Sequence, residues 1–369
     1  MNPQISNISE IGDVYTFTIN NINVSLANAV RRTILSDLPA LCFYTETYND
    51  NQCTIHVNTT RLHNEILKHR LSCIPIHEKD LNILPGSYVM ELDIQNDTDE
   101  MIIVTTEHFK IRNKTNGNYL TKDETRRIFP PCNKTQSFID FARIRPRIGN
   151  SIVGEQIKLT AEFSVHTAKE NSMFNVVSKC AYGNTPDIKK IDEVWEEHEK
   201  KLTADQMTAD EIEFEKKNFY LLDAQRHFVQ DSFDFTVQTV GVFENREIVQ
   251  KACKILHDKL INMIQLIDSD GVPINNSETT MDYCFDIILE DEDYTIGKVL
   301  EYILYEKYYM NEKILTFCGF KKFHPHNSDS TIRVAYSQNA DKRMVAQHLR
   351  FACVDAGEIF KRLHGIFER

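Results

Sequence analysis

The chain has 369 residues, 41% hydrophobic and 26% charged, which is the profile of a globular protein with room for two or three domains. Its formal net charge of −12 argues against a free-standing nucleic-acid binder, but not against a subunit that sits away from nucleic acid in a larger machine. No apolar run approaches the ~18 residues that span a bilayer, and the N-terminus lacks a signal-peptide pattern, so we expect an intracellular protein without membrane contact.

Residues 13–35 begin with an alternating stretch typical of a strand, followed by an apolar-periodic helix with Ser25 placed as its N-cap. Leu26 and Val30 form the apolar face of this helix. Asn28, Arg32 and Ser36 follow at i, i+4 spacing and share one polar face, and Arg31 precedes Arg32 to form a pair of arginines. An arginine fork suits bidentate contact with carboxylates or backbone carbonyls of another chain, and a purely internal contact has no obvious need for it. The alternative is a solvated helix face.

Residues 49–223 show several separate apolar runs and predict a mostly β insertion domain. Within it, residues 110–158 are basic, and three interpretations stay open: a phosphate-tracking stripe, a surface that docks an acidic protein, or solvated side chains. Residues 191–217 are dense in charge and predict a solvated helix or a loosely ordered excursion.

Signatures of chemistry are incomplete throughout the chain. Gly149 and Gly154 have P-loop spacing, but the lysine that would reach the phosphates is missing. The nine cysteines are scattered and contain no C-x-x-C pair, which predicts buried thiols and no stoichiometric zinc. We therefore expect no catalytic residue, no cofactor and no metal site.

A strand at 233–240 and a long helix at 244–268 complete the first half of the chain. Residues 269–280, rich in Gly, Pro, Asn and Ser, predict a flexible linker. Residues 281–369 then repeat the order of the first half: a strand, a helix with Thr295 as N-cap, a strand at 331–336 and a long helix at 341–366. With Ser25 and Thr295 aligned, Arg31-Arg32 correspond to Glu301-Tyr302.

Both long helices carry apolar residues at alternating steps of four and three, which is the seam of a helix that packs on another helix. We expect an α+β fold of two pseudo-equivalent strand–helix–strand–long-helix dimerisation halves, 1–48 plus 224–268 and 281–369, the first interrupted by the insertion. The alternative is two unrelated amphipathic helices. The predicted internal seam consists of Leu26, Val30, Val249, Cys253, Leu256, Leu260, Met263, Ile296, Leu300, Leu349, Ala352, Ala356 and Leu363.

Three motifs of the first half together resemble the α-type RNA polymerase subunits, a family that includes the archaeal D-like polypeptide and the third-largest eukaryotic subunit. They are Ala27-Asn28-Ala29-Val30-Arg31-Arg32, the Glu65, His69-Arg70-Leu71 and Ile74-Pro75 of segment 58–76, and the Ala-Lys-Glu of segment 154–174. Segments 290–304 and 317–334 of the second half resemble the smaller partner, which is the archaeal L-like polypeptide or the eleventh eukaryotic subunit. One departure is that no cysteine-rich loop follows the insertion helix. Another is the fusion itself, which resembles the arrangement in large DNA viruses.

The resemblance implies a non-catalytic platform on which the two largest polymerase subunits assemble, with one or two small zinc-binding subunits as further partners. Nucleic acid would be met only through the complex, and no homodimer is expected. The matching residues for docking large subunits are Asn28, Arg31, Arg32, Glu65, His69 and Arg70. A viral origin would place the chain in host cytoplasm and the virion interior, and a cellular origin in the nucleus. Two other functions stay open: a free-standing dimeric transcription regulator, or an enzyme with a novel site in the insertion.

Overall fold

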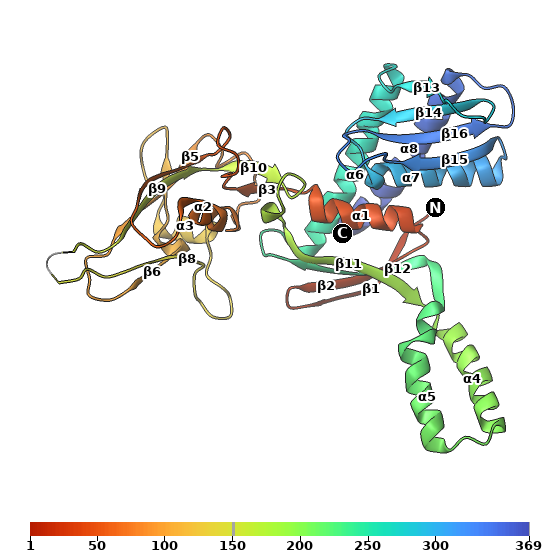
Figure 1. The fold of residues 1–369 in the computed structure, drawn as a ribbon, viewed down its shortest axis with the longest axis horizontal. Coiled ribbons are helices and arrows are strands. Elements are labelled where there is room, and N and C mark those ends of the chain that lie inside the picture. The colour runs from red at the N-terminus through yellow and green to blue at the C-terminus, as the bar shows by residue number, and fades with distance from the viewer. Residues whose placement is uncertain (150–151, 369) are drawn as a thin grey trace. The chain divides into compact units, whose positions relative to one another are not determined.

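The structure, a computed structural model, describes residues 1–149 and 152–368 (Figure 1). Arg369, the end of the second predicted half, lies outside the described residues. The fold is α+β and divides into two compact units. The first unit comprises residues 1–33, 179–238 and 245–369, and the second comprises 34–178 and 239–244. None of the described helices combines the length and apolarity needed to cross a bilayer.

The first unit contains two four-stranded sheets with the same spatial order of strands. One sheet runs β1 (Gln4–Ile11), β2 (Val14–Asn20), β12 (Phe228–Thr239) and β11 (Val177–Pro186). The other runs β13 (Ile274–Asn276), β14 (Cys284–Leu289), β16 (Ser330–Tyr336) and β15 (Leu315–Lys321). Counted along the chain, each sheet therefore has the order first, second, fourth, third.

In both sheets, helices follow the corresponding strands along the chain. A shorter helix follows the second strand, α1 (Val24–Ser36) in one case and α7 (Tyr294–Leu304) in the other, and a π-helical segment, Tyr305–Asn311, continues α7. A long helix follows the fourth strand, α6 (Asn245–Asp268) or α8 (Lys342–Glu368), and these two long helices pack on each other. Phe17 of β2 stacks on Phe235 of β12 with ring centroids 5.2 Å apart and meets Phe367 of α8 edge-on, which joins the first sheet to the last helix.

The caps of the two shorter helices lie two residues earlier than the sequence predicted. Asn23 Oδ1 accepts from the backbone N–H of Ser25 at 2.8 Å, and Asp293 Oδ1 accepts from that of Thr295 at 2.8 Å. The prediction of Ser25 and Thr295 as caps is wrong because asparagine and aspartate offer equally good acceptors two residues upstream. Since both caps shift equally, the alignment of the two helices is unchanged.

Two further segments differ from their predictions. Part of the predicted linker 269–280 is a strand, because Ile274–Asn276 forms β13 and pairs with β14. The charged stretch 191–217 forms neither a single helix nor a loose excursion but a hairpin of α4 (Ile188–Ala204) and α5 (Ala209–Leu221), which lie side by side in Figure 1. Its small core consists of Ile191, Trp195, Phe219 and Ala224.

The second unit is built mainly from strands. Its four-stranded sheet runs β4 (Cys53–Asn58), β9 (Gln156–Glu162), β5 (Tyr88–Gln95) and β7 (Lys110–Asn113). Two ribbons pair β6 (Ile102–Thr105) with β8 (Asp140–Ile144) and β3 (Pro39–Cys42) with β10 (Ser164–Thr167). The helices are α2 (Asn64–Ser72) and α3 (Lys122–Ile128), and short 3-10 turns cover Thr106–His108, Ser172–Phe174 and, in the first unit, Asp223–Arg226.

The boundaries of this unit differ from the predicted insertion, 49–223. It begins at Ile34, and the α4–α5 hairpin belongs to the first unit. The reason is local: β3 pairs with β10 inside the second unit, whereas the hairpin connects β11 and β12 of the first unit's sheet. Phe129 and Phe141 are fully buried in the second unit's core, which leaves neither ring free to stack on a nucleic-acid base.

Candidate partner-docking surfaces

All residues of the predicted internal seam are buried in the first unit. Hydrogen bonds at both ends of the α6–α8 pair fix its antiparallel direction. Arg246 at the start of α6 donates to the carbonyl of Phe367 at 2.9 Å, and Arg350 of α8 bonds Asp268 at the end of α6 at 2.7 Å. Burial raises the pKa of the Cys253 thiol in this seam to about 12, so it packs as an apolar residue.

Arg32 of α1 has its partners within the chain. Its Nη2 donates to Asp293 Oδ2 at 2.8 Å and its Nε to Thr295 Oγ1 at 2.9 Å, which ties α1 to the N-terminus of α7. Burial pushes the pKa of Asp293 upward, but the hydrogen bonds from Thr295 and the charge of Arg32 outweigh it and leave that pKa below its usual value. The sequence argument that internal pairing needs no arginine here is wrong for Arg32.

The neighbouring residues of α1 behave differently. Arg31 donates through Nε to Asn28 Oδ1 at 3.0 Å, within the same helix, and both side chains are half-buried. Among the described residues, neither the Asn28 nor the Arg31 side chain forms a hydrogen bond with α7, as Arg32 does. Of the three docking residues expected on α1, Arg31 and Asn28 therefore remain the better candidates for contact with another chain.

The three docking residues expected on α2 separate in the same way. Arg70 fastens α2 to β8, since its Nε donates to the carbonyl of Phe141 at 2.7 Å and its Nη2 to that of Asp140 at 2.6 Å. Glu65, in the first turn, is exposed. His69 lies 3.5 Å from Glu46, and its side chain is 62% exposed. All three residues are exposed, but the guanidinium of Arg70 is held by backbone carbonyls of β8, so Glu65 and His69 are the better candidates for docking.

Six of the eleven basic residues of the stripe 110–158 pair with carboxylates. Its ion pairs are Arg112 with Glu91, Lys114 with Glu162, Arg143 with Asp140, Arg145 with Glu155, Arg147 with Asp99, and Lys158 with Asp93. Pairing at six of the eleven cations interrupts the stripe as a track for phosphates, which weighs against the nucleic-acid interpretation.

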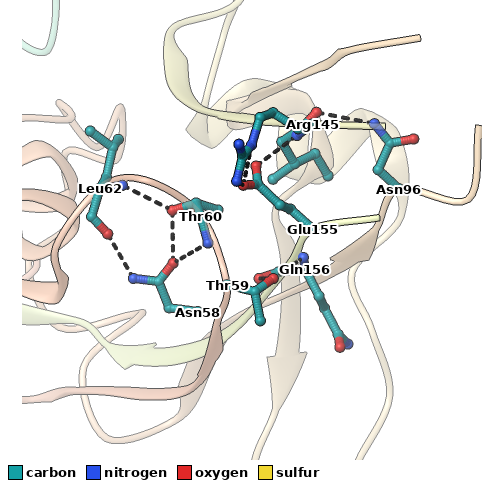
Figure 2. Close-up of polar contacts among 9 residues, drawn as sticks. Asn58, Thr59, Thr60, Leu62, Asn96, Arg145, Glu155 and Gln156 are labelled. Carbon is teal, nitrogen blue, oxygen red and sulfur yellow. Dashed lines mark hydrogen bonds and ion pairs between the residues drawn. The ribbon is translucent and has the colours of Figure 1, made fainter. Parts of the chain in front are cut away.

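The sequence did not reveal a pocket of about 510 Å³ in the second unit, near the residues drawn in Figure 2. Its lining comes from segments far apart in the chain: Arg61, Leu62, Arg70, Met101, Asp140, Ala142, Arg143, Arg145 and Glu155. One glycine of the incomplete P-loop supports it, because a Cβ on Gly154 would lie 1.7 Å from the carbonyl oxygen of Asn96. That glycine therefore serves a close backbone approach rather than a phosphate.

Metal-ligand groups do not gather within the part of the chain that the structure describes: no three His, Cys, Asp or Glu side chains there are placed to hold an ion. Cysteine thiols are mostly packed in cores, where burial raises the pKa of Cys42 to about 12 and that of Cys53 to about 11. In the part of the chain that the structure describes, the features with functional potential are therefore surfaces and pockets.

Residues 16–260 match the RNA polymerase Rpb3/Rpb11 dimerisation domain. The chain is similar to the DNA-directed RNA polymerase subunit Rpo3 of Methanosphaera stadtmanae, with 22% identity over 69% of this chain and 94% of the relative. For Rpo3 of Archaeoglobus fulgidus the identity is 22%, over 73% and 99%. For the RNA polymerase II subunit RPB3 of Schizosaccharomyces pombe it is 23%, over 72% and 87%.

Proposed function

Because the chain belongs to the RNA polymerase Rpb3/Rpb11 dimerisation-domain family, we propose that it is the non-catalytic assembly-platform subunit of a multisubunit DNA-directed RNA polymerase. The relatives named above are subunits of such polymerases. The absence of a complete catalytic signature in the sequence fits a subunit that organises others.

In this proposal both halves of the α-type dimer are fused in one polypeptide, residues 1–48 plus 224–268 forming one and 281–369 the other. The shared strand order of the two sheets supports this pairing, as does the antiparallel contact of α6 with α8. The observation that most supports the fused dimer is the ion pair of Arg32 with Asp293, which links the first short helix to the second. Fusion raises the effective concentration of one half around the other to roughly millimolar, so dimerisation no longer limits assembly.

The proposed partners are the two largest polymerase subunits and one or two small zinc-binding subunits. Asn28 and Arg31 on α1 and Glu65 and His69 on α2 are the proposed contacts, because they leave polar groups accessible. The fused arrangement further leads us to propose a large DNA virus as the source, which would place the chain in host cytoplasm and the virion interior.

Affinity purification from cells or particles that make the protein tests the assembly role. With a tag on this chain, peptides of both large polymerase subunits should appear in the eluate at comparable amounts. Glu65→Lys should reduce their recovery without changing the melting temperature, whereas Glu107→Lys, on an exposed turn of the same unit, should leave recovery unchanged. Recovery of the chain without large subunits would rule the proposal out.

A further inference from the structure

The pocket in the second unit, here called the arginine pocket, concentrates positive charge in an acidic protein. Four arginines and two carboxylates line it, so it holds an excess of two positive charges in a chain of net charge −12. Its other lining residues are the apolar side chains of Leu62, Met101 and Ala142. The basic stripe of residues 110–158 contributes Arg143 and Arg145, and docking of an acidic protein was one interpretation left open for it. The sequence did not indicate that Arg61, Arg70 and apolar residues join them in one pocket.

Buried polar contacts hold the wall of the arginine pocket in place. Glu155 is 7% exposed and accepts from the backbone N–H of Arg145 at 2.7 Å and from its Nε at 2.6 Å (Figure 2). Asn96 is fully buried and donates to the carbonyls of Ile144 at 3.0 Å and Glu100 at 2.8 Å. This wall is therefore set before any ligand arrives, and less ordering is needed on binding.

A second set of contacts fixes the rim. Asn58 accepts from the backbone N–H of Thr60 at 3.0 Å and donates to the carbonyl of Leu62 at 2.8 Å, as Figure 2 shows. This turn holds Arg61 and Leu62 next to each other at the edge of the pocket. Both residues line the pocket.

The four arginines differ in whether a carboxylate neutralises their charge. Arg145 is neutralised by Glu155, whereas Arg70 bonds only backbone carbonyls in that region and keeps its full charge. Arg143 forms only a long, exposed ion pair with Asp140 at 3.7 Å, beyond hydrogen-bond reach, and Arg61 makes no hydrogen bond or ion pair with the described residues. Arg61 and Arg143 are also exposed, so their donors are available to a ligand.

The lining distinguishes between classes of anion. Guanidinium groups match a carboxylate through paired hydrogen bonds, and the apolar residues suit one apolar side chain beside it. The carboxylates of Asp140 and Glu155 within the lining, and the net charge of −12, both oppose a phosphate or a nucleic-acid strand, which carries more negative charge.

We propose that the arginine pocket binds an acidic peptide segment of another protein, with an Asp or Glu carboxylate on Arg61 and Arg143 and a neighbouring apolar side chain against Leu62, Met101 and Ala142. This binding belongs to the chain itself and does not depend on the assembly role proposed above.

Fluorescence anisotropy of a labelled peptide tests this proposal on the full chain at low salt. The probe is fluorescein-Gly-Asp-Leu-Glu-Leu-Gly-amide, and the matched neutral peptide carries Asn and Gln in place of Asp and Glu. We expect the acidic peptide to bind at least about tenfold more tightly, since each hydrogen bond between charged groups contributes about that factor. Arg61→Gln and Arg143→Gln should each weaken binding by about tenfold.

The matched control is Arg126→Gln, which removes an equally exposed arginine from α3, outside the pocket, and should bind the probe like the wild type. Melting curves verify that each variant is folded. Equal affinity for the neutral peptide, unchanged binding by both pocket variants, or no binding at millimolar peptide would overturn the proposal. Displacement of the probe by inorganic phosphate or a short oligothymidylate at equal concentration would also overturn it, because the pocket would then select phosphate.

Discussion

Replacing Arg32 with methionine removes its guanidinium but keeps an unbranched side chain on α1. The change breaks the bonds to Asp293 at 2.8 Å and Thr295 at 2.9 Å. Hydrogen bonds to charged groups contribute roughly 1.5–3 kcal/mol when well shielded, but the Arg32 and Asp293 side chains are 34% and 32% exposed. After allowing for solvent screening, we expect Arg32→Met to lower the free energy of unfolding by about 1–2 kcal/mol.

A double-mutant cycle with Asp293→Asn isolates the tie between α1 and α7. Asparagine still caps α7 but carries no charge, so the cycle reports the ionic contact rather than the cap. Urea denaturation of the four proteins should give an interaction free energy of about 1 kcal/mol. Arg31→Met, which removes only a bond within α1, is the control and should cost less.

The effect of pH gives a second check of the same contact. The pKa of Asp293 is lowered in the folded chain, so its contribution is complete above the ordinary carboxyl pKa of about 3.9 and is lost as the pH falls through the lower folded value. The stability difference between wild type and Arg32→Met should therefore shrink in that acidic range. If the effects of Arg32→Met and Asp293→Asn on the free energy of unfolding simply add at neutral pH, the proposed contact between α1 and α7 is refuted.

Three other predictions concern the first unit. Leu260→Asp places an unpaired carboxylate in the buried seam and should abolish soluble protein, whereas Lys254→Asp, on the exposed face of α6, should express normally; a wild-type melting curve for Leu260→Asp would show the burial to be wrong. Light scattering should give the mass of a monomer, and a homodimer that survives dilution would show pairing between chains. Burial lowers the pKa of His348, whose Nδ1 lies 3.0 Å from Tyr336 Oη, so the unfolded state binds more protons and the melting temperature should drop as the pH falls through about 6.5. His348→Gln should reduce that drop, and an equal drop in both proteins would contradict this assignment.

The features most accessible from sequence were those that rest on periodicity. Apolar residues at four-three steps follow from the geometry of two packed helices, and the residues so selected on α6 and α8 are buried. The correction of both caps leaves the alignment of α1 with α7 unchanged, because both caps shift by two residues. Cap positions themselves were less accessible, since Asn23 and Ser25 are both good acceptors.

Features that depend on distant residues were not visible in the sequence. Arg32 finds its carboxylate some 260 positions away, and no local pattern distinguishes it from Arg31. The α4–α5 hairpin hides a small core around Trp195 within a run of charges. Similarly, the arginine pocket draws Arg61 and Arg143 from separate strands and turns, so that the basic stripe resolves into paired cations and a few exposed ones.

We propose above that one chain, with its halves paired internally, supports both large polymerase subunits. The mass of the intact complex purified through this chain, measured by native mass spectrometry, tests it most directly. We expect one copy of this chain for one copy of each large subunit. Two copies of this chain in the complex, or a species that contains no large subunit, would contradict it.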